Sequence, residues 1–194
     1  MQITGFSYGA MMTRVTFKPD HTAFDDYYAV RANLQAQGAT TEGELRRAFS
    51  NLLVDAGKLQ KWTLVEERIR KANNSNRNIH PDGTLLDKWN LAYGYWEAKD
   101  GNDDLEAEII KKRQKGYPFT NIIFEDTQQA VLYQDGMRIT ETPLTDREGV
   151  ARLLTEFLNY ESAPFQEFEK AVDYFKGEIP QIATGLKERI DDAH

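Results

Sequence analysis

The fold is decided by one stretch, Asp82-Gly-Thr-Leu-Leu-Asp87-Lys-Trp-Asn-Leu-Ala-Tyr-Gly-Tyr-Trp-Glu97-Ala-Lys99-Asp100. If residues 91–99 form a strand, its period of two places Glu97 and Lys99 on the same face. The segment 84–89 is rich in apolar residues and can pair with that strand as the other arm of a hairpin. Such a hairpin brings an aspartate close to Glu97, so the sequence predicts two carboxylates and an ammonium group on neighbouring strands.

Two aspartates compete for the position beside Glu97. Asp87 reaches it if the hairpin turn is centred near Ala92, whereas Asp82 reaches it if the turn is centred near the Trp89-Asn90 peptide. Asp82 belongs to a Pro-Asp-Gly sequence, where an aspartate usually serves a turn. Asp87 falls inside the predicted strand, where an aspartate is disfavoured unless something requires it. We therefore predict Asp87 as the partner of Glu97 and keep Asp82 in reserve.

An acidic residue followed on the next strand by an acid-any-Lys triplet is typical of metal-dependent nucleases. Glu97-Ala-Lys99 is the only Asp/Glu-any-Lys triplet in the sequence. Burying one side of this aromatic strand makes paired charges costly unless they serve a purpose. A surface ion pair on an edge strand remains the alternative from the spacing alone. In the functional interpretation, Asp87, Glu97 and the backbone carbonyl of Ala98 hold the metal, and Lys99 is catalytic.

The composition restricts which metals and partners are possible. The 194 residues include no cysteine, and the three histidines lie far apart in the sequence, so a metal would need oxygen ligands, which favours Mg²⁺ with Mn²⁺ as a substitute. The net charge of -7 opposes tight nonspecific binding to DNA, unless a larger partner delivers the domain. The sequence shows neither a membrane-spanning apolar run nor a signal peptide, so we expect a cytoplasmic protein.

The remaining segments predict helices around the central hairpin. We expect helices over 24–34, 41–57 and 105–115, and three amphipathic helices beyond residue 145. Strands are expected over 13–17, 62–69, 120–124 and 130–133. Glu42, at the start of the second helix, could point toward the same metal ion, although an acid that complements the helix dipole explains it as well. A basic helix end could contact DNA phosphate or simply face solvent; it comprises Lys111, Lys112, Arg113 and Lys115.

Several short segments together carry a family pattern. They are Pro81-Asp-Gly-Thr, Gly94-Tyr-Trp-Glu-Ala-Lys-Asp100, Asp103-Asp-Leu-Glu-Ala-Glu-Ile109, Gly116-Tyr-Pro, Asn121-Ile-Ile-Phe-Glu-Asp126 and Ala130-Val-Leu-Tyr-Gln134. The pattern resembles the nuclease region of large fused restriction-modification enzymes, in which a PD-(D/E)xK nuclease precedes an adenine methyltransferase and, in some, a helicase motor. The resemblance implies an α/β (α+β) restriction-endonuclease-like fold and Mg²⁺-dependent hydrolysis of double-stranded DNA. It assigns Asp87 or Asp82, Glu97 and Lys99 to the catalytic set.

The same resemblance suggests how the chain is divided. Residues 1–40 would be an N-terminal extension, 41–144 the nuclease core, and 145–194 a helical connector to methyltransferase and possibly helicase domains. The sequence contains neither a Gly-x-x-x-x-Gly-Lys-Ser/Thr motif nor an Asn/Asp-Pro-Pro-Tyr motif. An alternative is a nuclease-like module that has lost cutting and serves for DNA docking or interaction, and a purely structural domain is a third possibility.

Overall fold

The computed structural model describes residues 14–36, 42–73, 76–161 and 179. The chain divides into two compact units, residues 1–160 and 161–194, and the helices and strands from Thr22–Ala36 to Arg147–Leu158 belong to the first unit. The second and third of the three helices expected beyond residue 145 lie outside the described residues. No helix among the described residues is long and apolar enough to cross a bilayer.

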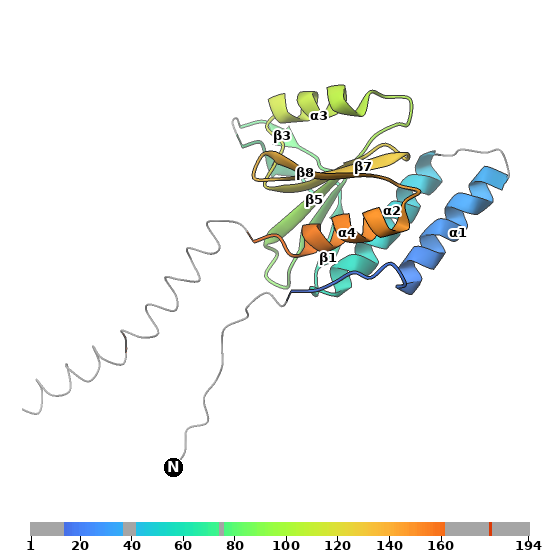
Figure 1. The fold of residues 1–194 in the computed structure, drawn as a ribbon. Coiled ribbons are helices and arrows are strands. Elements are labelled where there is room, and N and C mark those ends of the chain that lie inside the picture. Colours follow the sequence, from blue (N-terminus) through green and yellow to red (C-terminus); the bar gives the residue numbers. More distant parts are fainter. Residues whose placement is uncertain (1–13, 37–41, 74–75, 162–178, 180–194) are drawn as a thin grey trace, which may run out of the picture. The chain divides into compact units, whose positions relative to one another are not determined.

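The centre of the first unit is a six-stranded mixed sheet with strand order β1-β4-β5-β6-β7-β8 (Figure 1). The strand bounds are β1 Thr63–Glu66, β4 Gly83–Leu86, β5 Ala92–Ala98, β6 Asn121–Glu125, β7 Gln129–Gln134 and β8 Met137–Pro143. Strands β5 and β6 run parallel and every other neighbouring pair is antiparallel. Helix α3, Leu105–Gln114, connects the parallel pair, as a parallel connection requires. The predicted mixed α/β class is therefore confirmed.

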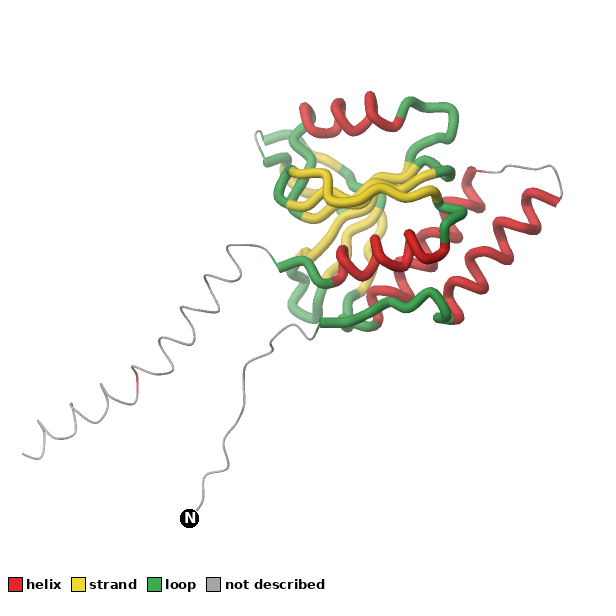
Figure 2. The backbone as a smooth tube through the Cα atoms, in the orientation of Figure 1, coloured by secondary structure: helices red, strands yellow, loops and turns green. Residues whose placement is uncertain are grey.

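Helices cover both faces of the sheet (Figure 2). One face packs against α1 Thr22–Ala36, α2 Glu42–Lys58 and α4 Arg147–Leu158, whose buried residues share one core with Trp96 and Leu132. The other face packs against α3 and the small ladder of β2 Arg70–Lys71 with β3 Asn78–Ile79. Successive residues of β5 serve the two cores alternately, because Tyr95 belongs to the second core and Trp96 to the first.

The sequence explains where the principal helices begin and what they bury. Asp104 caps α3 by accepting hydrogen bonds from the backbone N–H groups of Glu106 and Ala107, and Asp146 caps α4 in the same way through Gly149. The apolar stripe of α4 is fully buried and comprises Val150, Leu153, Leu154, Phe157 and Leu158. Helix α4 is thus part of the core rather than of a connector.

The predicted domain boundaries at residues 40 and 144 differ from the compact unit. Both α1 and α4 bury their apolar faces in the same core as α2, which places them inside the folded unit. Within α1, Phe24 and Tyr27 are buried in this core, whereas Val30 is exposed. Within α3, Ile109 is buried, whereas Ile110 is 56% exposed.

Some predicted strands also differ from the structure. Residues 14–17, the described part of the segment 13–17, run without strand pairing, because the Asn159 side-chain amide bonds both backbone groups of Val15 at 2.8 and 2.7 Å. The strand predicted over 62–69 ends at Glu66, since Glu67 adopts a φ of 51°. Strand β8 and the β2–β3 ladder were not predicted. Strands β2 and β3 are only two residues long each, and the alternating apolar residues of β8, Met137 and Ile139, are exposed.

Gly94 allows α4 to lie directly against β5. A Cβ atom placed on Gly94 would lie 2.3 Å from Cζ of Phe157, which is far inside van der Waals contact. We expect Gly94→Ala to lower the free energy of unfolding by about 1–3 kcal/mol through overpacking. Urea denaturation measures this change. The control is Gly43→Ala in α2, where no atom lies within 4 Å of the added carbon; an equal loss in both variants would contradict the packing argument.

Candidate metal-dependent active site

The tip of the β4–β5 hairpin is built by Asp87. Its Oδ1 accepts hydrogen bonds from the backbone N–H groups of Trp89 at 2.8 Å and Leu91 at 2.9 Å. The turn is therefore centred near residue 89, and Leu86 pairs with Ala92. Glu97 lies five residue steps along the strand from Ala92, a distance of about 16 Å. The prediction that Asp87 lies beside Glu97 is wrong, because its carboxylate is used to close the turn at the far end of the strand.

Asp82, the reserve candidate, is the aspartate that the fold brings to Glu97. The ladder pairs Gly83 with Trp96, so the next position along places Asp82 opposite Glu97. The Oδ2 atom of Asp82 accepts a hydrogen bond of 2.8 Å from the backbone N–H of Ala98. Where β4 begins and β5 ends, the carboxylate thus accepts the kind of hydrogen bond that a backbone carbonyl accepts elsewhere in the β4–β5 ladder. Its Oδ1 forms an ion pair of 2.6 Å with Nη2 of Arg46 on α2.

Glu97 is a buried carboxylate with two lysines on one oxygen. Its side chain is 2% exposed, and its Oε1 accepts a hydrogen bond of 2.8 Å from Nζ of Lys99, which confirms that the two residues share a face. Nζ of Lys112 donates to the same Oε1. Within the described part of the chain, Oε2 has no hydrogen-bond partner. A buried oxygen without a partner is costly, and it marks the position where a cation could bind.

Lys112 reaches this site from α3, and the sequence did not predict that. Its Nζ also lies 3.0 Å from the hydroxyl of Tyr117, which in turn donates to the backbone carbonyl of His80 at 3.1 Å. Burial lowers the pKa of Lys112, but the Glu97 carboxylate and the Tyr117 hydroxyl together outweigh burial and raise the pKa above its usual value. Lys112 therefore carries a charge in the interior of the site.

The other members of the predicted basic helix end point elsewhere. Lys111 is exposed and pairs with Glu108 at 2.5 Å. Arg113 stacks over the ring of Phe119 at 4.4 Å and donates to the backbone carbonyl of Gly136. Lys115 is exposed at the C-cap of α3. The four residues therefore do not form a single basic surface, and the only one placed among the catalytic candidates is Lys112.

Glu42 pairs with Asp100, the residue that follows Lys99. The hydrogen bond between the two carboxyl groups is the main cause that raises the pKa of Glu42, and the same contact lowers the pKa of Asp100. Glu42 also lines a hollow of about 720 Å³ together with Gly101, Asn102 and Thr127. The structure thus places Glu42 next to the end of the motif, with Asp100 as its carboxylate partner.

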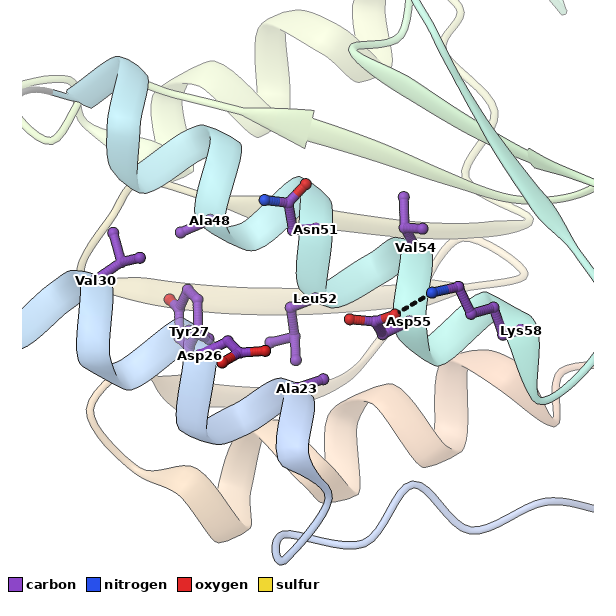
Figure 3. A pocket seen from close by; sticks show the side chains of 10 residues that line it. All are labelled: Ala23, Asp26, Tyr27, Val30, Ala48, Asn51, Leu52, Val54, Asp55 and Lys58. Carbon is purple, nitrogen blue, oxygen red and sulfur yellow. Dashed lines mark hydrogen bonds and ion pairs between the residues drawn. The ribbon is translucent and has the colours of Figure 1, made fainter.

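A smaller hollow of about 320 Å³ lies between α1 and α2 (Figure 3). An ion pair of 2.5 Å between Asp55 and Lys58 lies along it. The residues that line it are Ala23, Asp26, Tyr27, Val30, Ala48, Asn51, Leu52, Val54, Asp55 and Lys58. They include neither Asp82 nor the residues of the Glu97-Ala-Lys99 triplet, so the candidate site is separate from this groove.

The oxygen donors at the end of the hairpin suit a hard divalent cation. Asp82 and Glu97 offer carboxylate oxygens, and the buried Oε2 of Glu97 has no partner among the described residues. The described residues contain no cluster of three or more His, Cys, Asp or Glu that could hold a metal. A cation here would thus take two carboxylates and a backbone carbonyl, with water filling the remaining positions. This donor set fits Mg²⁺, which usually keeps several waters when bound.

Glu125 is a buried acid that the sequence pattern did not single out. It lies on β6 beside Ala98, is 1% exposed, and accepts a hydrogen bond of 2.8 Å from the backbone N–H of Thr127. Burial raises the pKa of Glu125 to about 7. An acidic residue at the end of an otherwise apolar strand was the available signal, but the sequence alone does not reveal that the side chain points inward.

The comparisons with known proteins agree with this fold. No protein-family model and no curated protein matched the chain. A chain in the cryo-EM structure of a DrdV–DNA complex is similar, with 39% sequence identity and a TM-score of 0.78. The match covers 89% of this chain and 17% of that chain, so this chain spans about one sixth of the length of the protein it matches. The fold is restriction-endonuclease-like, and the similar protein is bound to DNA.

Glu125 makes the stability depend on pH. Its pKa of about 7 in the folded protein exceeds the ordinary value of 4.5, so the folded state binds more protons between these values. The free energy of unfolding should therefore fall as the pH rises from 4.5 to 7, by up to about 3 kcal/mol from this group. Denaturation at several pH values should show that Glu125→Gln removes this slope, while Glu156→Gln on the exposed side of α4 keeps it. A slope that persists in Glu125→Gln would contradict the assignment.

Proposed function

We propose that this chain is a PD-(D/E)xK nuclease domain that hydrolyses DNA phosphodiester bonds with Mg²⁺, as part of a restriction-modification enzyme. The observation that carries the proposal is the convergence of Asp82, Glu97 and Lys99 where β4 begins and β5 ends. The similarity to a protein in complex with DNA supports the same substrate.

The charges at the site suit a phosphodiester. Arg46, Lys99 and Lys112 bring three cationic groups to Asp82 and Glu97, and the Glu108 carboxylate also interacts with the two lysines. This concentration of cationic groups contrasts with the net charge of -7 of the whole chain. The cationic groups can therefore interact with the phosphates of an anionic substrate at this end of the sheet.

Each residue has a distinct role in this proposal. Bound Mg²⁺ would lower the pKa of a coordinated water and offset the charge that builds on the phosphoryl group. Asp82 is held by the backbone N–H of Ala98, the residue that follows Glu97 in β5, so its carboxylate is fixed at this end of the hairpin. Glu97 is buried and offers Oε2, while the ammonium of Lys99 orients the attacking water or stabilises charge on the phosphoryl oxygens.

The net charge indicates that other domains bring the DNA to this site. Affinity for duplex DNA comes largely from neutralised phosphates, which an acidic domain supplies poorly. We assign the recognition of DNA to methyltransferase and possibly helicase domains of the same polypeptide, consistent with the small share of the similar chain that this chain spans. Cleavage of foreign DNA, as in defence against phage, would be the biological outcome.

One observation favours a second candidate, a nuclease-like DNA-docking module without cutting. Both candidate metal ligands already have cationic side-chain partners, because Arg46 pairs with Asp82 and two lysines pair with Glu97. A module of this kind would bind DNA without binding a divalent cation. Retention of the full Asp82, Glu97 and Lys99 set favours the nuclease.

Removing the Lys99 ammonium tests the catalytic role. Lys99→Ala should lower Mg²⁺-dependent plasmid cleavage by at least about 100-fold, because it removes a charge aimed at the transition state. Thermal unfolding should show that the variant remains folded. Wild-type cleavage by folded Lys99→Ala would refute the role of Lys99.

The two aspartates provide a matched pair of variants. Asp82→Asn removes a negative charge beside Glu97 and should abolish cleavage. Asp87→Asn retains the oxygen that accepts from Trp89 and Leu91, so it should keep the turn and the activity. The same plasmid assay compares them. Loss of cleavage in Asp87→Asn with retention in Asp82→Asn would reverse the assignment.

A further inference from the structure

Two lysines from different elements share one oxygen of Glu97. Lys99 follows β5 directly, whereas Lys112 extends from α3, the helix that crosses over the sheet. The lysine side chains are only 13% and 12% exposed, and that of Glu97 is 2% exposed. Solvent therefore screens these charges poorly, and their interactions are stronger than those of a surface ion pair.

A divalent cation bound to Glu97 would lie beside two ammonium groups. Nζ of Lys99 and Nζ of Lys112 both contact Oε1 of Glu97, and the Glu108 carboxylate also interacts with both lysines. Like charges a few ångströms apart repel strongly at the effective dielectric constant typical of sites near a protein surface. The ion can therefore bind Glu97 tightly only if one of the ammonium groups moves away from the carboxylate.

Lys112 is the group that can move without losing every partner. Its Nζ lies 3.0 Å from the Tyr117 hydroxyl and 4.3 Å from the centre of the Tyr117 ring, and both contacts stabilise a cation away from Glu97. Lys99 has Glu97 as its ion-pair partner and shares a strand face with it. The long flexible stem of Lys112 allows this small displacement.

We propose that Lys112 is a positioning residue. Its ammonium group holds the Glu97 carboxylate while the metal is absent, and it competes with the divalent cation for that carboxylate. This inference rests on the proposed function of Glu97 as a metal ligand. Lys112 keeps the buried carboxylate neutralised and oriented while the ion is absent. It also weakens the binding of the ion, because its ammonium must first be displaced.

The test is a calorimetric titration of the 194-residue chain with Mn²⁺ in the absence of DNA. Lys112→Met should bind Mn²⁺ at least about tenfold more tightly than the wild type, because one competing charge is gone. Lys111→Met is the matched control, since Lys111 is the preceding residue, is exposed, and pairs with Glu108. It should bind Mn²⁺ as the wild type does. Unchanged or weaker binding by folded Lys112→Met overturns the proposal.

Two further variants separate this inference from the proposed function. Lys112→Gln also removes the charge but keeps a polar side chain, so it should reproduce the tighter binding if Lys112→Met does not fold. Glu97→Gln should abolish binding in every background. If the wild type binds Mn²⁺ through Glu97 and the Lys112 variants bind equally well, the inference alone fails. If neither the wild type nor any Lys112 variant binds Mn²⁺, the inference and the proposed metal site both fail.

Discussion

The hydrogen bond from the backbone N–H of Ala98 to the Asp82 carboxylate is the constraint on which the site depends. It fixes the register of β4 against β5 at the last position of the hairpin, one residue beyond the Gly83–Trp96 pair. A slip of one residue would turn every side chain of β5 to the opposite face. Trp96 would then leave the core it shares with α2. Burial of the Trp96 ring and the positions of the Asp82 and Glu97 carboxylates therefore require the same register.

Burial of Glu97 determines the electrostatics of the site. A carboxylate that is 2% exposed must be neutralised, and the structure does so with Lys99, which follows β5, and Lys112, which comes from α3. The proposed metal site consequently depends on α3 as well as on the hairpin. The position of α3 is in turn set by Leu105 and Ile109, which pack with Tyr95 and Ile122 in the second core.

Most of the framework could be predicted from the sequence, because the spacing of apolar residues along a helix or strand indicates which side chains are buried. The strand that carries Glu97 is confirmed, although it ends one residue before Lys99, and so are the helix capped by Asp104 and the apolar stripe of α4. The choice of Asp87 over Asp82 was wrong, since it depended on a turn whose position the Asp87 side chain itself determines. Lys112 looked like one of several surface lysines, because periodicity does not reveal which helix residue meets a carboxylate across the sheet.

The contacts of Asn159 have a consequence for how the compact unit could be joined to other proteins. Its side-chain amide binds Val15, so the chain enters and leaves the unit at neighbouring points. Asn121 bonds both the Phe157 and the Tyr93 carbonyls, which places this corner at the starting ends of β5 and β6, whereas Glu97 lies near the finishing end of β5. Val15 and Asn159 therefore lie near the end of the sheet that is remote from Glu97, so neither end of the folded unit occupies the proposed site.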